Sequence, residues 1–346
     1  MNIVVLCGGL SGERDVSISS GTGAANALRR LGHNAVLIDL YLGYTEPFDE
    51  PAEVFAAAGE LETCRVGETV PDLETVKAMR PDDGHRVGPN VLELCMAADI
   101  TFMALHGEDG ENGKVQAMLD LYGVKYTGCG YLGSALAMNK SLSKTVFHSL
   151  GIASPEGVTL TRGQAREYLP PDFPRVVKPC SGGSSVGTSV VSNAGEYAAA
   201  LELAFKYEEK IIVERFIKGR ELTVGVMDGE AMPVIEVVPN QGFYSYRSKY
   251  QAGAALEICP AQIGARMRQR VQRLAERVAR ALMIDAYCRV DFLWEVDSDE
   301  IYCLEANTLP GMTPTSLIPQ MAAAMDMDYG RLCERIIEVS MKKYEK

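Results

Sequence analysis

Residues 288–313 read CRVDFLWEVDSDEIYCLEANTLPGMT, and the rest of the chain can be understood from this stretch. Two runs of mostly alternating apolar and polar residues, 290–296 and 301–307, flank a short polar segment at 297–299. That segment, Asp-Ser-Asp, has residue types that are typical of a tight turn. The pattern therefore predicts an antiparallel β-hairpin.

A loop at 297–299 would place Val296 opposite Glu300 and Asp291 opposite Glu305. Side chains on a strand point alternately to its two faces. The face expected to lie in a core carries Val290, Phe292, Trp294, Val296, Tyr302, Leu304 and Ala306. The other face is polar at the open end of the hairpin, where it carries Arg289, Asp291, Glu305 and Asn307.

The two carboxylates, Asp291 and Glu305, would repel each other across the hairpin, so a cation is expected between them. Carboxylate and amide oxygens without Cys or His suit Mg²⁺ or Mn²⁺, which complete their shells with water and phosphate oxygens. Arg289 could hold a developing anion beside such a metal. A solvated polar face on an ordinary hairpin explains the same residues equally well.

The composition of the whole chain is that of a globular protein. It has 346 residues, of which 47% are hydrophobic and 23% charged, enough for two or three domains. No apolar run approaches a membrane span, and MNIVVLCGG lacks the basic region of a signal peptide. The net charge of −12 argues against nucleic acid as the main partner, and nine irregularly spaced cysteines favour a reducing cytoplasm.

The N-terminal part has the pattern of an open α/β sheet. An apolar strand at 2–7, a helix at 16–31 and a strand at 35–40 form a β-α-β unit with a glycine turn. The turn lacks G-x-G-x-x-G, so it supports an NAD site poorly, although a helix N-terminus there favours anions. Glu13 lies at this turn, and a surface role is the simpler explanation for it.

A third strand, at 99–105, ends at His106 and a glycine-rich turn followed by a helix at 114–123. Ligands of open α/β sheets bind at the carboxyl ends of the strands, so His106 and Glu13 share such a place. A structural and a functional role for His106 are equally well supported. The irregular segment 43–98, with five prolines, is interpreted as an elaborated connection.

A smaller unit follows a helix predicted at 134–150. Two strands flank Pro-Cys-Ser-Gly-Gly-Ser-Ser within residues 175–191, and such a loop can donate backbone N–H groups and hydroxyls to phosphates. Lys178 at the end of the first strand is a natural phosphate contact. A strand predicted over 210–224 carries Glu214 and Glu221, which could accept from an adenine amino group and ribose hydroxyls or could simply be exposed.

The loop 240–261 is long for a compact domain and rich in aromatic and basic residues, as lids over active sites often are. A helix at 262–283 has an apolar face. The final helix, at about 328–344, is expected to bury Leu332, Ile336 and Ile337.

Taken together, these motifs resemble the D-alanine–D-alanine ligases, a family of the ATP-grasp superfamily. The resemblance covers nearly the whole chain except about 43–98. It rests on GGLSGERDVS (8–17), ALHGEDGENG (104–113), YTGCG (126–130), MNK (138–140), VVKPCSGGSSVG (176–187), VERF (213–216), SKY (248–250), RVDF (289–292) and LEANTLPGMTPTSL (304–317). Each motif is weak alone, but all of them occur in the order of the family.

The resemblance implies a mixed α/β (α+β) fold with a three-domain ATP-grasp architecture. The expected boundaries are 1–132 for an N-terminal open parallel-sheet domain that binds substrate and includes 43–98, 133–216 for the central unit with the phosphate loop, and 217–346 for the C-terminal unit with the metal site and lid. ATP would lie between the last two units. Two D-alanine molecules would be joined through an acyl phosphate to give D-alanyl-D-alanine for peptidoglycan synthesis.

The resemblance also implies roles for individual residues. Those expected to bind ATP are Lys140, Lys178, Ser185, Glu214, Arg215, Phe216, Ile217 and Glu221. Those expected to bind two Mg²⁺ ions, with Mn²⁺ as a substitute, are Asp291, Glu305 and Asn307. The catalytic residues would be Glu13, Ser184, Tyr250, Arg289 and Gly311, the last two at the oxyanion. The residues in contact with the amino acids would be His106, Lys249, Ser316 and Leu317.

Three alternatives remain open. The second substrate could be D-serine or, less readily, D-lactate, although the Lys249-Tyr250 pair favours an amine nucleophile. The chain could be a catalytically silent nucleotide-binding module, which the retained Arg289 and its polar neighbours disfavour. An NAD enzyme is not supported. The resemblance further implies a cytoplasmic homodimer that binds neither nucleic acid nor membranes. The phosphate loop departs from the family, because it reads Cys180-Ser181-Gly182-Gly183 where many relatives have charged residues.

Overall fold

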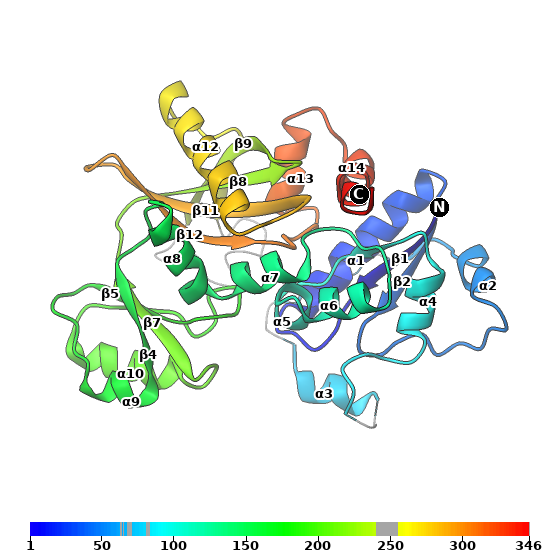
Figure 1. The fold of residues 1–346 in the computed structure, drawn as a ribbon, viewed down its shortest axis with the longest axis horizontal. Helices are drawn as coiled ribbons and strands as arrows, with labels where there is room; N and C mark the ends of the chain where they lie inside the picture. The colour runs from blue at the N-terminus through cyan, green and yellow to red at the C-terminus, as the bar shows by residue number, and fades with distance from the viewer. Residues whose placement is uncertain (63, 65, 68–70, 81–83, 240–254, 346) are drawn as a thin grey trace.

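The computed structural model describes residues 1–346 except 63, 65, 68–70, 81–83, 240–254 and 346 (Figure 1). Its described strands form three sheets: a parallel one near the N-terminus and two antiparallel ones. In this described part, no helix is both long and apolar enough to span a membrane.

The N-terminal sheet has the order β2-β1-β3, and all of its strands are parallel. Its strands are β1 (Asn2–Cys7), β2 (Asn34–Asp39) and β3 (Ile100–Met103). The helices of this part are α1 (Arg14–Arg30), α2 (Pro51–Ala56), α3 (Leu73–Ala78), α4 (Val91–Ala97), α5 (Glu108–Glu111) and α6 (Lys114–Leu121). The predicted β-α-β opening is therefore confirmed, and the described residues of the connection 43–98 contain three short helices.

One helix predicted at 134–150 is in fact two, α7 (Tyr131–Met138) and α8 (Lys140–Ser149). Asn139 separates them with an extended backbone, ψ 97°, and its side chain accepts a hydrogen bond from the N–H of Leu142. Asparagine competes for backbone donors in this way, which favours a helix start over a helix interior.

The first antiparallel sheet has the order β4-β7-β5-β6, with α9 and α10 packed on it (Figure 1). Its elements are β4 (Gly157–Thr161), α9 (Arg162–Glu167), β5 (Arg175–Pro179), β6 (Ser189–Val191), α10 (Ala194–Ala204) and β7 (Lys210–Arg215). The predicted strand, loop and strand at 175–191 are confirmed as β5 and β6.

The second antiparallel sheet has the order β10-β9-β8-β11-β12. Its elements are β8 (Arg220–Met227), β9 (Glu230–Pro239), β10 (Ala255–Ile258), α12 (Ala265–Ala281), β11 (Tyr287–Glu295) and β12 (Glu300–Asn307). The single strand predicted over 210–224 is wrong, because β7 and β8 belong to different sheets. Gly219 lies at the crossing, where a Cβ would stand 2.5 Å from the carbonyl oxygen of Trp294.

The hairpin β11–β12 is present, but its register shifts by one residue after Asp291. Asp291 faces Glu305 as predicted, whereas Glu295 rather than Val296 faces Glu300. The extra residue on β12 is Leu304. A bulge of this kind changes the face on which the following side chains lie.

The bulge corrects the predicted core face. Ile301 and Cys303 are buried in the core in place of Tyr302 and Leu304, and Val296 is 51% exposed. The residues predicted correctly to lie in the core are Val290, Phe292 and Ala306, while Trp294 is half-buried against the core. Leu304 and Glu305 both line the same cavity, so the bulge gives that cavity two adjacent side chains from one strand.

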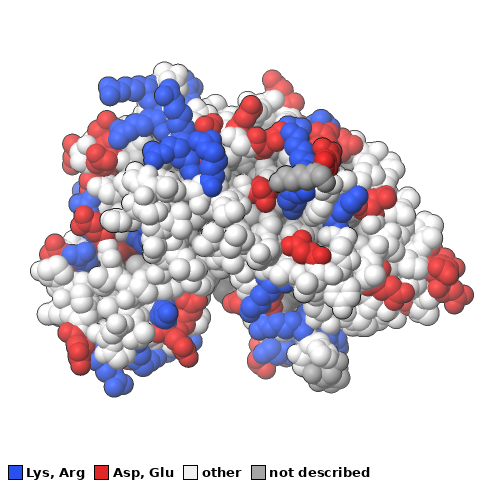
Figure 2. Space-filling model, viewed as in Figure 1, with Lys and Arg blue, Asp and Glu red and all other residues white. Residues whose placement is uncertain are grey.

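Helix α12 carries a concentrated basic surface on its solvent side. Its apolar face, which includes Met267, Val271 and Val278, packs on the five-stranded sheet. Figure 2 shows Lys and Arg gathered over this helix. The exposed arginines are Arg266, Arg268, Arg270, Arg273, Arg277 and Arg280. The excess negative charge of the chain is therefore carried elsewhere.

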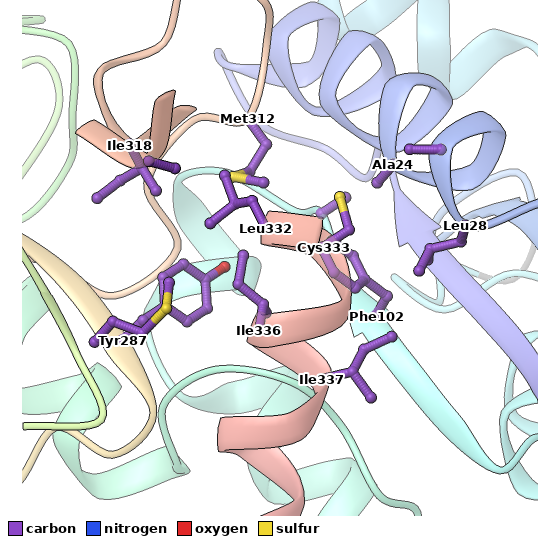
Figure 3. Close-up of a cluster of buried hydrophobic side chains, with 14 of the residues drawn as sticks. Ala24, Leu28, Phe102, Tyr287, Met312, Ile318, Leu332, Cys333, Ile336 and Ile337 are labelled. Carbon is purple, nitrogen blue, oxygen red and sulfur yellow. The ribbon is translucent and has the colours of Figure 1, made fainter. Parts of the chain in front are cut away.

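The two ends of the chain share one hydrophobic core. Helix α14 (Tyr329–Met341) packs against α1 and the N-terminal sheet, as Figure 3 shows for Leu28, Phe102, Cys333 and Ile337. Leu332, Ile336 and Ile337 are buried as predicted. The remaining elements are α13 (Leu317–Ala323) and the 3₁₀ turn η1 (Lys342–Tyr344).

Candidate active site

A deep pocket lies between the two antiparallel sheets, with an empty volume of ≈ 900 Å³ including its open mouth. The four-stranded sheet contributes Lys178 and Glu214, and the five-stranded sheet contributes Glu221 and Asp291. Apolar side chains that suit a flat ring line it as well: Val176, Phe216, Ile217, Leu293 and Leu304. The segment 181–186 forms one wall.

A buried ion triad stands inside this pocket. Glu214 is 2% exposed, and its carboxylate accepts Lys178 Nζ at 2.5 Å and Lys144 Nζ at 2.7 Å. Burial would raise the pKa of Glu214, but the two ammonium groups outweigh it and lower that pKa. Burial also lowers the pKa of Lys144, against the attraction of Glu214. The triad of one carboxylate and two ammonium groups therefore carries a net positive charge, beside which an anion or a polar ring edge can bind.

The loop between β5 and β6 connects this pocket to the N-terminal sheet. Ser184 and Ser185 have backbone φ angles of 53° and 59°, which residues other than glycine rarely adopt. The Ser184 hydroxyl donates to Glu13, and Gly183 passes so close that a Cβ would stand 2.8 Å from Glu13 Oε2. Strained backbone with a hydroxyl tied to a carboxylate is typical of a functional loop.

Glu13 is enclosed by two glycines from different parts of the chain. Gly107, with φ +66°, follows β3, and a Cβ there would stand 2.7 Å from Glu13 Oε2. Gly183 closes the opposite side. The segment after β3 and the loop between β5 and β6 thus both contact the Glu13 carboxylate. This position disfavours the explanation of Glu13 as a surface residue.

The open end of the hairpin is a dense polar cluster. Asp291 Oδ1 accepts from Thr223 Oγ1 at 2.5 Å and from Arg289 Nε at 2.9 Å. Asp291 Oδ2 accepts from an Arg289 terminal nitrogen at 2.8 Å and from Asn307 Nδ2 at 3.1 Å. The structure therefore brings together Arg289, Asp291 and Asn307, as the hairpin register predicts.

Glu305 pairs with a lysine that comes from a different sequence region. Lys140 Nζ lies 2.9 Å from Glu305 Oε2 and donates to the carbonyl of Gly182 at 2.8 Å. Burial would lower the pKa of Lys140, but Glu305 outweighs it and the pKa is raised. The repulsion expected between Asp291 and Glu305 is thus offset here by two protein cations, Arg289 and Lys140.

The donor set fits a hard divalent cation. Two carboxylates, Asp291 and Glu305, face each other in the hairpin, and the amide of Asn307 adjoins them. Oxygen ligands of this kind suit Mg²⁺, which keeps water and phosphate ligands rather than a full protein cage. Among the described residues, no group of three or more His, Cys, Asp or Glu is placed to hold a metal ion.

A second cavity of ≈ 630 Å³ adjoins the first across Gly183 and Ser184, which line both. The predicted substrate residues in its wall are Glu13, His106, Arg289, Gly311, Ser316 and Leu317. Gly311 is required by a close approach, because a Cβ would stand 2.7 Å from Ser316 Oγ. A small polar molecule in this cavity would lie beside the end of the large pocket.

The remaining predicted residues have varied positions. Ser185, Arg215, Phe216, Ile217 and Glu221 all line the large pocket. The Arg215 guanidinium also pairs with Glu295 and donates to Tyr302. Lys249 and Tyr250 lie outside the described residues, as does most of the predicted loop 240–261. Residues 255–258 of the predicted loop form strand β10.

Sequence reasoning missed three residues of this site. Thr223 holds Asp291, Lys144 holds Glu214, and Glu111 lines the second cavity. Burial and the nearby Glu13 raise the pKa of Glu111 to about 8. The position of Lys144, one helical turn after Lys140, is a signal that could have identified it. Thr223 could be found only from the pairing of β8 with β11.

Comparisons with known proteins agree over the whole chain. Two family models match, "D-ala D-ala ligase N-terminus" at residues 2–129 and "D-ala D-ala ligase C-terminus" at residues 147–338. A D-alanine–D-alanine ligase of Pediococcus pentosaceus is 43% identical over 352 residues, covering 100% of this chain and 99% of the relative. One from Geobacter sulfurreducens is 39% identical over 338 residues, covering 97% and 92%. The solved D-alanine–D-alanine ligase of Bacillus anthracis complexed with ATP has a TM-score of 0.75 at 29% identity, covering 100% and 99%.

Proposed function

The chain belongs to the D-alanine–D-alanine ligase family, and from that premise we propose that it joins two D-alanines with ATP to give D-alanyl-D-alanine. Its fold is that of the ATP-grasp ligases. The observation that carries the proposal is the junction of the two cavities at Gly183 and Ser184. A nucleotide in the large pocket and an amino acid in the small one would meet there.

The first step would be attack by the carboxylate of one D-alanine on the γ-phosphorus of ATP, with ADP as the leaving group. The product is an acyl phosphate. The amine of the second D-alanine then attacks the acyl carbon, phosphate leaves, and the amine loses a proton. Such transfers depend mostly on positioning and on neutralising charge.

The chain's own residues suit these tasks. Lys178, Lys140 and the loop donors near Ser185 would hold the phosphates, and Glu214 with its neighbours to Ile217 would hold the adenine. Glu221 at the edge of β8 would accept from the ribose. The apolar lining and the polar ends of the pocket support this assignment.

The second cavity, which we call the amino-acid cavity, has separate groups for different parts of the two D-alanines. Glu13, held by Ser184, would bind the ammonium of the first D-alanine. Arg289 and the Gly311 N–H would stabilise the tetrahedral oxyanion. Ser316 and Leu317 would meet the carboxylate of the second D-alanine, and His106 would line the subsite of the first.

Asp291, Glu305 and Asn307 would hold two Mg²⁺ ions, with Mn²⁺ as a substitute, and the ions would supply neutralising charge for the phosphates when bound. Tyr250, Lys249 and the segment around them are proposed as the lid that excludes water from the acyl phosphate.

The proposal also includes domain boundaries, a cellular location and an oligomeric state. The proposed domains are 1–132, 133–216 and 217–346, although Ala137 and Phe147 lie in the core of the five-stranded sheet. A cytoplasmic location for peptidoglycan precursor synthesis is supported by nine cysteines that are all free thiols. A homodimer remains a prediction.

The proposal is tested by following phosphate release and dipeptide formation with ATP, Mg²⁺ and D-alanine, in parallel reactions that also contain D-serine or D-lactate. D-alanyl-D-alanine as the main product is the expected result. No phosphate release with any D-amino acid would exclude the ligase function. Release of phosphate with a mixed product as the main species would assign a different second substrate.

A further inference from the structure

The wall of the amino-acid cavity that carries Gly311 is held in place by Ser20 and Tyr329, which lie outside the assigned site, and by His106, which lies within it. Residues 309–312 have no helix or strand hydrogen bonds of their own, so their positions depend on contacts with other parts of the chain. Leu309 and Met312, the two end residues of this segment, are 1% and 2% exposed. A peptide N–H that must meet an oxyanion needs such support, because errors of about 1 Å are costly in catalysis.

Three hydrogen bonds hold the segment at its ends. The carbonyl of Leu309 lies 2.8 Å from His106 Nδ1. The N–H of Met312 donates to Ser20 Oγ at 3.1 Å, and the carbonyl of Met312 accepts from Tyr329 at 2.7 Å. Gly311 lies between these fixed points.

Ser20 joins two of these contacts into one chain. It is fully buried in the middle of α1, and its Oγ lies 3.0 Å from His106 Nε2 while also receiving the Met312 N–H. One hydroxyl of the N-terminal unit therefore links the strand-end histidine to the backbone next to Gly311.

The donors and acceptors in this series of hydrogen bonds have a single consistent assignment. The Leu309 carbonyl can only accept, so His106 Nδ1 must carry a proton. The Nε2 atom of a neutral imidazole is then an acceptor, and the Ser20 hydroxyl donates to it. The lone pairs of Ser20 Oγ remain for the Met312 N–H. Each donor and acceptor in this series of hydrogen bonds therefore has a partner.

A neutral imidazole agrees with its surroundings. Burial lowers the pKa of His106, which is 4% exposed, and Arg289 acts in the same direction against the opposing influence of Glu13. Both ring nitrogens are engaged within the protein. A direct contact of a ring nitrogen with substrate is therefore not needed to explain why a histidine occupies this place.

We propose that Ser20 is a positioning residue for the ligase reaction, which acts through His106 and the Met312 N–H to fix the peptide of Gly311 at the oxyanion. The proposal rests on the proposed function, because it supposes that the Gly311 N–H stabilises the tetrahedral intermediate. We call Ser20, His106 and the backbone groups of Leu309 and Met312 that they bind the relay. Within it, His106 links Ser20 to Leu309.

The test compares Ser20→Ala with a matched control on the same helix. Ser17 is also fully buried, and its Oγ likewise makes two hydrogen bonds, from the Gly8 N–H at 2.8 Å and to the Ala104 carbonyl at 2.7 Å. Ser17→Ala should lower thermal stability about as much as Ser20→Ala, since each loses two comparable bonds. Only Ser20→Ala should lower kcat, by about 10- to 100-fold, with KM for ATP changed less than about threefold.

Variants of His106 separate positioning from other roles. The side chain of Gln can donate to Leu309 and accept from Ser20, so His106→Gln should keep kcat within about fivefold of the wild type. His106→Ala should lose as much as Ser20→Ala, and the double variant should lose little more, as expected for groups that act as one unit. Equal losses for His106→Gln and His106→Ala would overturn the relay.

A measurement that needs no turnover keeps the two proposals distinct. Amide hydrogen exchange of peptides that cover 309–313 should be faster in Ser20→Ala than in Ser17→Ala or the wild type. Unchanged exchange together with wild-type kcat in Ser20→Ala would overturn the relay alone. An inactive wild type would overturn the ligase function, while the exchange result would still decide whether Ser20 holds the segment.

Discussion

Replacing Arg289 by alanine should tighten the binding of a bare metal ion while it slows the reaction. In the structure, the guanidinium donates two hydrogen bonds to Asp291, at 2.9 and 2.8 Å, and the two side chains are 16% and 9% exposed. A divalent ion that coordinates Asp291 without nucleotide must displace or share this contact. Arg289→Ala removes that competition and leaves the Thr223 and Asn307 donors in place.

The size of the effect follows from the pair. Unit charges about 4 Å apart attract by about 4 kcal/mol at an effective dielectric constant of about 20, and much of this is offset by desolvation. A net contribution of about 1.5–3 kcal/mol is usual for hydrogen bonds to a charged group. Even the lower value corresponds to about a tenfold gain in Mn²⁺ affinity.

The assay is titration of nucleotide-free protein with Mn²⁺, followed by electron paramagnetic resonance of the free ion. Arg220→Ala is the matched control, because Arg220 makes a similar two-bond pair with Glu236, at 2.6 Å each, outside the pocket. It should leave Mn²⁺ affinity unchanged. In turnover assays, Arg289→Ala should lower kcat by roughly 10²- to 10³-fold, as loss of an oxyanion donor does. Bare-ion affinity that is unchanged or weaker in Arg289→Ala would refute this account of the cluster.

Other substitutions test other parts of the site. Thr223→Val should weaken Mn²⁺ binding by about 10-fold through loss of the hydroxyl that orients Asp291, whereas Thr223→Ser should not, and calorimetric titration would distinguish them. The folded-state pKa of Glu214 is lowered, so its stabilising contribution is present above the unfolded value near 4.5 and is lost as pH falls below it. Glu214→Gln should flatten that acid loss in urea unfolding between about pH 3 and pH 6 and should lower stability at neutral pH, where two buried ammonium groups lose their partner. Gly311→Ala should lower the melting temperature because its Cβ meets Ser316 Oγ, and the added change Ser316→Ala should restore part of it; an additive loss in the double variant would contradict the clash.

The open end of the hairpin could be derived from sequence because side-chain alternation is a local property. The predicted turn was one residue too short, since Glu295 rather than Val296 faces Glu300. Asp291 still faces Glu305 as predicted, because the bulge compensates for that one residue. The bulge at Leu304 could not be derived, since one extra residue on a strand leaves no mark in the pattern of apolar residues. It depends on which side chains the nucleotide pocket and the core accept.

Contacts between distant segments were the part that sequence patterns could not supply. The hydroxyl of Thr223 reaches Asp291 because β8 pairs with β11, and the hydroxyl of Ser20 reaches Met312 across 292 positions of sequence. Neither residue stands out by type or spacing. The division of one predicted helix at Asn139 is different, because an asparagine before a polar helical turn is a local signal of a helix start.

The shared core of α1 and α14 has a consequence for how the chain acquires its structure during synthesis. Ala24, Leu28 and Phe102 are made early, but the side chains that cover them, Cys333 and Ile337 among others, belong to the last helix. The N-terminal sheet must therefore keep an apolar surface uncovered until α14 has been synthesised. Such exposed surface promotes aggregation. A chain that ends before α14 would keep every proposed substrate contact and still lack the cover of its first domain.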